Sequence, residues 1–169
     1  MDRRVEEIMQ EVHESLKESL YNNDTSIRDN TNCYAFAIGA TYPNLEIYRI
    51  GNICGKKQIT ESYFSIEEIK ELLYSDLEVL DLKIEESTLE EEVLENQHKI
   101  ILFAKVWKTG QIADYHFYRC DNNIWKEKWR GRKIQMIENF QRDRIDKIYP
   151  WSIIGIFKVT KWKNIWFYF

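Results

Sequence analysis

Apolar side chains near the start of the chain recur at helical spacing. Residues three and four apart share one face of a helix, so the pattern predicts an amphipathic helix over residues 3–20. Its apolar positions are Val5, Ile8, Met9, Val12, Leu16 and Leu20. The polar run 21–32 then breaks the pattern. A compact apolar segment begins at Cys33 and meets a helix-ending glycine at Gly39, which predicts a second helix, capped by the polar residues before it.

The middle of the chain mixes loop, helix and strand signals. Residues 41–62 contain Pro43, Gly51 and Gly55 and are predicted to be irregular. "SIEE" is a capping box that predicts a helix over about 65–74. "LEVLDLKI", at 77–84, alternates and predicts a strand. "STLE" repeats the capping-box pattern and predicts a short helix over 87–96.

The second half changes to strand patterns separated by turn residues. Apolar and aromatic runs bounded by polar turns are typical of antiparallel strands. Helices followed by such strands predict an α+β fold, in which N-terminal helices pack on an antiparallel sheet. The predicted strands of this β-meander, which spans residues 99–169, are 99–107, 113–120, 124–129, 151–160 and 164–169, with a turn at "DNN" between the second and third.

Composition places the chain among ordinary globular proteins. A length of 169 residues suits one domain, and hydrophobic residues at 44% can supply its core. The net charge of -4 is mild and gives no reason to expect nucleic acid as the main partner. No apolar run reaches the ~20 residues that span a bilayer, so no membrane partner is expected. The N-terminus lacks the apolar core of a secretion signal, which predicts a cytoplasmic protein or one exported without a classical signal peptide.

The three cysteines, Cys33, Cys54 and Cys120, cannot all pair with one another. In a chain without a secretion signal they are interpreted as free thiols in a reducing compartment. There is no CxxC motif, and the histidines are not at ligand spacing from the cysteines, so neither a metal nor another cofactor is expected.

The position of Cys33 suggests chemistry rather than packing. A thiol at a helix N-terminus gains from the helix dipole, which favours the thiolate and predicts a lowered pKa. A nucleophilic thiol also needs a base, and His116 lies mid-strand among aromatic residues. A histidine there is also compatible with a half-buried strand residue that donates to a backbone carbonyl. His13 and His98 are interpreted as solvent-facing.

Two segments together carry a family resemblance. "NCYAFA" at a helix start and "DYHFYRCDNNIW" on a later hairpin resemble small bacterial papain-like cysteine peptidases, whose broader relatives are NlpC-type peptidases and amidases. The family pattern is Asn-Cys-Tyr-x-Tyr-Ala, then Asp-Tyr-His-x-Tyr-Arg, a turn, and Trp-Ser-His-Lys. The resemblance implies one papain-like domain over 1–169. In it, 1–29 would be an N-terminal helix and polar connection, 30–40 the nucleophile helix, and 99–169 the sheet carrying the histidine.

The resemblance implies roles for three residues. Cys33 would be the nucleophile and His116 the general base. The family's third polar residue falls on "WKEK", where Glu127 replaces the family histidine. A hairpin turning at Asn122 and Asn123 would place Tyr118 opposite Glu127, with His116 one diagonal step away. A carboxylate there could stabilise the imidazolium.

Other candidate site residues lie around these three. Asn32 could support an oxyanion or act only as the helix cap. Tyr34 and Trp125 are candidates for substrate binding, with core packing as the alternative for both. Asp114 and Arg119 are interpreted as a structural ion pair, with substrate binding as the alternative.

The sequence therefore predicts a cysteine hydrolase, a thiol-dependent peptidase or amidase that acts on a peptide or protein substrate through an acyl-thioester. Two alternatives remain open. One is a catalytically inactive papain-like interaction module, such as an immunity or adaptor protein, which the altered "WKEK" favours. The other is a basic-aromatic binding protein, suggested by the interleaved tryptophans and cations of "IWKEKWRGRK".

Overall fold

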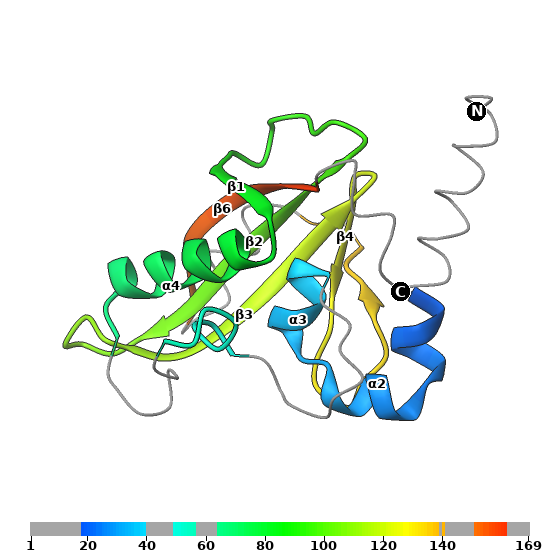
Figure 1. Cartoon of the computed structure of the whole chain (residues 1–169), viewed down its shortest axis with the longest axis horizontal. Helices are drawn as coiled ribbons and strands as arrows, with labels where there is room; N and C mark the ends of the chain where they lie inside the picture. Colours follow the sequence, from blue (N-terminus) through cyan, green and yellow to red (C-terminus); the bar gives the residue numbers. More distant parts are fainter. Residues whose placement is uncertain (1–17, 40–48, 57–63, 139, 141–150, 162–169) are drawn as a thin grey trace.

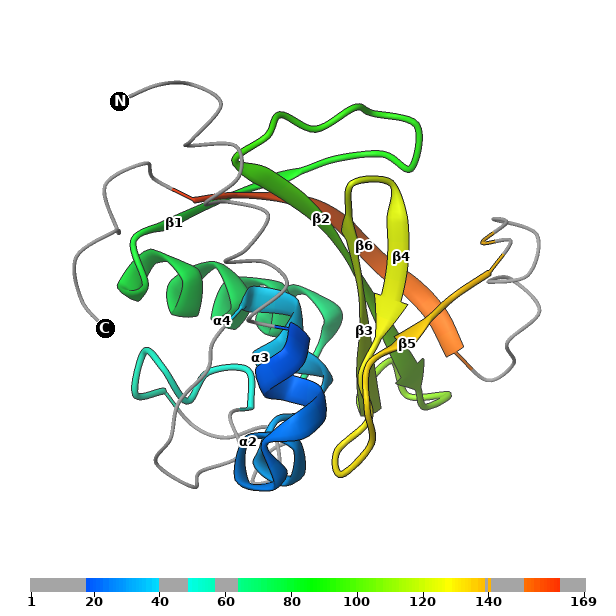
Figure 2. The same ribbon diagram turned by 90° about the vertical axis from the view of Figure 1, so that its right-hand side faces the viewer.

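The computed structural model describes residues 18–39, 49–56, 64–138, 140 and 151–161. These residues form an α+β fold, in which helices cover one face of an open antiparallel sheet of six strands (Figures 1 and 2). The predicted fold class is confirmed at this level. The helices are α2 (Thr25–Asn30), α3 (Cys33–Ile38) and α4 (Ile66–Val79), and the strands are β1 (Leu82–Glu86), β2 (Gln97–Val106), β3 (Ile112–Asp121), β4 (Ile124–Glu127), β5 (Gln135–Met136) and β6 (Trp151–Lys161).

The strand order is β1-β6-β2-β3-β4-β5, so the sheet is not a simple meander. Strands β2, β3 and β4 follow one another, as predicted, and the short β5, which was not predicted, pairs next to β4. Strand β6 returns to pair with both β1 and β2. A strand in that position buries apolar side chains on the helix-covered face, where Phe157 and Val159 are fully buried. The prediction that the strand at 151–160 continues the meander is therefore wrong, because β6 lies between β1 and β2.

The helices differ from the predicted ones mainly at their ends. The polar run 21–32 is not a simple break, because Asp24 accepts the Ile27 N–H and caps α2. The capping box at Ser65 is confirmed, but α4 continues to Val79. Leu77 thus lies in the helix rather than in the predicted strand 77–84, because it shares the buried face of α4 one helical repeat after Leu73.

The predicted helix over 87–96 is absent, and this segment forms bends and turns. The buried ammonium of Lys99 explains the difference. Its Nζ donates to the backbone carbonyls of Thr88, Leu89 and Glu91, which a helix would need as acceptors. A lysine from the sheet thus outweighs the local capping signal.

Several predicted features lie outside the described residues. They are residues 3–17 of the first predicted helix with His13, residues 41–48 and 57–62 of the irregular segment, and the strand 164–169. Residues 18–23 are helical, in agreement with the end of that first helix. None of the described helices has both the length and the apolar character required to cross a bilayer.

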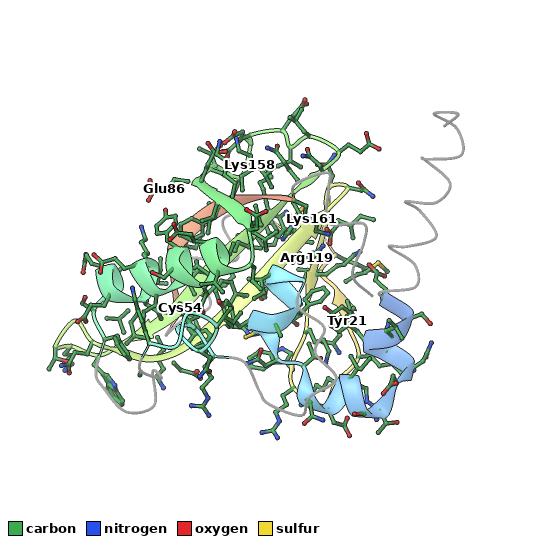
Figure 3. All side chains as sticks on the ribbon, in the orientation of Figure 1. Tyr21, Cys54, Glu86, Arg119, Lys158 and Lys161 are labelled. Carbon is green, nitrogen blue, oxygen red and sulfur yellow. The ribbon has the colours of Figure 1, made fainter. Side chains whose placement is uncertain are left out.

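The C-terminal end of α3 is held by two side chains of the sheet. The Nε2 atom of His98 lies 2.9 Å from the Ala37 carbonyl oxygen. His98 is buried, so the prediction that it faces solvent is wrong. Arg119 donates to the Phe36 carbonyl at 3.2 Å and lies against α3 in Figure 3. His98 thus supplies a partner for a carbonyl at the helix end, and Arg119 adds a second donor to the Phe36 carbonyl, which also accepts the Gly39 N–H.

The buried His98 side chain should make the free energy of unfolding decrease as the solution becomes acidic. Burial lowers the pKa of His98 well below its usual value of 6.5, and the Arg119 guanidinium lowers it further, against an opposing effect of Asp121. Below about pH 6.5 the unfolded chain then binds more protons than the folded one, so the free energy of unfolding decreases as the pH drops. Urea unfolding between neutral and acid pH measures this loss. His98→Gln, which keeps a donor for Ala37 without the titration, should show a smaller pH dependence, and an equal slope for both proteins would contradict the assignment.

Candidate functional site

The nucleophile candidate opens α3 as the sequence predicted. Asn32 caps the helix, because its side chain accepts the Ala35 N–H at 2.9 Å. Cys33 is the first helical residue, and Gly39 ends the helix with a left-handed φ of 73°. The capping role of Asn32 is thus confirmed, while an oxyanion role stays a prediction.

The hairpin that carries the histidine has the predicted register. β3 and β4 turn at Asn122 and Asn123, both of which have positive φ, and Tyr118 lies opposite Glu127. Asparagine tolerates this backbone conformation better than most residues, which explains why the turn forms there. The local sequence was therefore sufficient to position Glu127 relative to β3.

His116, Glu127 and Trp129 form one contiguous cluster. His116 Nε2 lies 3.1 Å from Glu127 Oε2, and both side chains are largely buried. The Trp129 ring stacks on the imidazole with centroids 4.0 Å apart, and its Nε1 donates to the same Glu127 oxygen at 3.0 Å. The carboxylate therefore fixes the imidazole and the indole together. The sequence missed Trp129 in this role, although its spacing of two from Glu127 already placed both on one strand face.

Cys33 and His116 lie on different faces of β3. Phe117 faces α3 and packs in the same core as Cys33, whereas His116 faces the other side with Tyr118. Within the described residues, β4 pairs with β3 only from Tyr118 onward, which leaves the preceding edge of β3 without a strand neighbour. The Phe117 backbone, next to His116, is among the groups that lower the pKa of the Cys33 thiol. Within the described residues, no hydrogen bond joins the Cys33 thiol to the His116 imidazole, whose Nε2 is held by Glu127.

The state of the thiol differs from the predicted one. Burial raises the pKa of Cys33 to about 12, and the backbone N–H groups of Phe117, Tyr34 and Cys33 itself offset this only in part. Asp114 adds a further small increase through its charge. The prediction of a lowered pKa was therefore wrong, because burial outweighs the helix dipole of a helix six residues long. The thiol holds its proton at neutral pH.

Alkylation rates should follow this burial. Cys54 is half-buried, whereas Cys33 and Cys120 are 8% and 3% exposed. Iodoacetamide at neutral pH is therefore expected to label Cys54 first and Cys33 slowly, since only an accessible thiolate reacts. Mass spectrometry of the labelled peptides over time measures the order. Fastest labelling at Cys33, with a midpoint below about pH 8.5, would show that a resting thiolate exists after all.

The remaining candidates are placed elsewhere. Tyr34 is fully buried and its hydroxyl donates to Asp76 at 2.7 Å, which supports the core-packing alternative for this residue. Trp125 stacks on Phe140 with centroids 4.6 Å apart, as part of the apolar cluster on the face away from the helices. The predicted ion pair of Asp114 with Arg119 is also wrong, because Arg119 pairs with Asp121 at 2.8 Å.

Lys128 links the two halves of the candidate site. Its side chain is fully buried, and Nζ donates to the carbonyls of Arg28 and Thr31, at 2.9 and 3.0 Å, just before the nucleophile helix. The same ammonium lies 3.4 Å from the Trp129 carbonyl and 2.9 Å from that of Arg132. The sequence analysis did not single out Lys128, and no local signal indicated its backbone partners.

No family model, curated protein or solved structure matches this chain. Within the described residues, no group of three His, Cys, Asp or Glu side chains could hold a metal ion. A functional proposal must therefore depend on the geometry of the residues around Cys33 and His116.

Proposed function

We propose that this protein is a papain-like cysteine hydrolase, which cleaves an amide bond, most readily a peptide bond, through an acyl-thioester on Cys33. One observation supports this best: the Glu127 carboxylate is hydrogen-bonded to Nε2 of His116, while the Trp129 ring stacks on one face of the imidazole. Among the described residues, Nδ1 makes no hydrogen bond, so it is the nitrogen that can accept a proton. An imidazole held by a carboxylate in this way is a suitable general base.

The chemistry begins from a neutral thiol. As the sulfur attacks the substrate carbonyl, His116 takes the proton from Cys33, and the Glu127 carboxylate stabilises the imidazolium. The imidazolium then protonates the leaving amine as the carbon–nitrogen bond breaks, which leaves an acyl-thioester. Water, deprotonated by His116, attacks the thioester and releases the acid, and the proton returns to sulfur. Because the pKa of Cys33 is raised by burial, proton transfer accompanies attack instead of preceding it.

A second candidate is a non-catalytic module with the same fold, and a specific observation favours it. The Cys33 thiol is buried, keeps its proton and makes no hydrogen bond with the His116 imidazole in the described part of the chain. A protein of this kind would bind a partner without cleaving it. The basic-aromatic alternative is less well supported, because Lys126 pairs with Glu18 and Lys128 is buried.

Peptide cleavage separates the two candidates. The protein is incubated with a peptide mixture from a digested, denatured protein, and new amino termini are identified by mass spectrometry. Hydroxylamine in the reaction traps the acyl-thioester as a hydroxamate. The hydrolase proposal expects new termini with the unmodified protein and none with Cys33→Ala. Equal results from the two proteins would eliminate the hydrolase and leave the non-catalytic module.

A further inference from the structure

The turn after β4 lies next to the candidate site and has a fixed shape. The Arg132 N–H donates to the Trp129 carbonyl at 3.0 Å, and Gly131 adopts a positive φ of 72° that suits glycine. Trp129, at the start of the turn, stacks on His116. The first residue of the turn is therefore in direct contact with His116, the group proposed as the base.

Lys128 fastens this turn to the nucleophile helix. Its ammonium contacts carbonyls at both ends of the turn, at Trp129 and Arg132, and the Thr31 carbonyl before α3. The β4–β5 turn lies beside the α2–α3 junction in both ribbon views (Figures 1 and 2). The backbone of the turn is thus held next to the start of α3, so a ligand that binds the turn needs to order only its side chains.

The turn presents three exposed cations, Arg130, Arg132 and Lys133. Within the described residues, none of these side chains forms a salt bridge, and Arg130 donates only to the backbone carbonyl of Asp29. The neighbouring Glu127 carboxylate is already bound to His116 and Trp129. In a chain with a net charge of -4, this is a local concentration of positive charge at the candidate site.

We propose that Arg130, Arg132 and Lys133 bind an acidic segment of the peptide substrate and hold the adjoining amide bond at Cys33. This proposal rests on the proposed function. Guanidinium and ammonium groups recognise carboxylates by charge-assisted hydrogen bonds, and an exposed cluster also steers an acidic partner toward the site. The substrate class is thus a peptide rich in Asp or Glu.

The surroundings favour a peptide over a nucleic acid. Nucleic-acid binding depends on many phosphate contacts along an extended basic track. Here the cations are confined to one turn, and the exposed Glu138 and the half-buried Glu127 flank them in sequence. A short acidic segment fits such a limited cluster better than a polyphosphate backbone.

Binding is measured by fluorescence anisotropy with a labelled oligo-glutamate peptide and the Cys33→Ala protein, so that docking is tested independently of cleavage. The variant Arg130→Gln/Arg132→Gln/Lys133→Gln should bind about tenfold more weakly. The matched control Lys56→Gln/Lys83→Gln/Lys108→Gln removes the same charge at exposed positions elsewhere and should bind like the parent. Arg130→Lys/Arg132→Lys should keep most of the affinity, and added salt should weaken binding.

Absence of binding, or equal losses in the turn variant and its control, would overturn the proposal. Tighter binding of labelled oligo-thymidine than of oligo-glutamate, lost in the same turn variant, would overturn it in favour of nucleic acid. Cleavage of neutral peptides by the unmodified protein without any oligo-glutamate binding would leave the hydrolase intact and remove only this docking role.

Discussion

His116→Ala is expected to lower the rate of peptide cleavage by about 10³- to 10⁴-fold, because the thiol loses its proposed base. A Cys33 that holds its proton at neutral pH depends on that base more than a preformed thiolate would. The rate is measured on any peptide that the unmodified protein cleaves. Glu127→Gln should cost less, because a glutamine oxygen still accepts the imidazole N–H but no longer stabilises the imidazolium by charge.

His98→Gln is the matched control, since His98 is also buried but contacts the far end of α3. It should retain most of the activity. If His116→Ala cleaved peptides as fast as the unmodified protein, His116 would be a structural residue and the proposed mechanism would fail. Trp129→Phe adds a finer comparison, because it can keep the stacking on the imidazole but loses the hydrogen bond to Glu127.

Lys128→Met is expected to destabilise the protein by about 3 kcal/mol. Methionine fills a similar volume but leaves the backbone carbonyls of Arg28, Thr31 and Arg132 without the ammonium donor, and unsatisfied buried acceptors are costly. The free energy of unfolding in urea measures the effect. Lys133→Met, at an exposed position in the same loop, should change it by less than about 0.5 kcal/mol.

The pH dependence of the free energy of unfolding, compared between the unmodified protein and Lys128→Met, gives an independent check on Lys128. Burial lowers the pKa of Lys128 to about 8, from 10.5 when exposed. Between these values the unfolded chain binds more protons than the folded one, so stability should rise with pH through this window. Lys128→Met should lose that rise. A variant as stable as Lys133→Met, with an unchanged pH profile, would show that the buried ammonium contributes nothing.

Local signals predicted the elements that depend on neighbours in sequence. The capping box at Ser65, the helix between Cys33 and Gly39, and the hairpin that sets Tyr118 opposite Glu127 all formed as predicted. Each is fixed by hydrogen bonds and backbone preferences within a few residues. For the same reason the hairpin sequence is enough to place Glu127 within reach of His116.

Long-range contacts decided the rest. A capping signal at 87–90 failed because Lys99 took the carbonyls of that segment, and the insertion of β6 beside β1 does not follow from the order of strands along the chain. The sequence alone determined the α+β class, the cap before Cys33 and the pairing of His116 with Glu127, since these follow from local geometry. Only the tertiary structure determined that burial keeps Cys33 protonated and that Lys128 joins the turn after β4 to the start of α3, because desolvation and backbone contacts between distant segments arise only when the chain is packed.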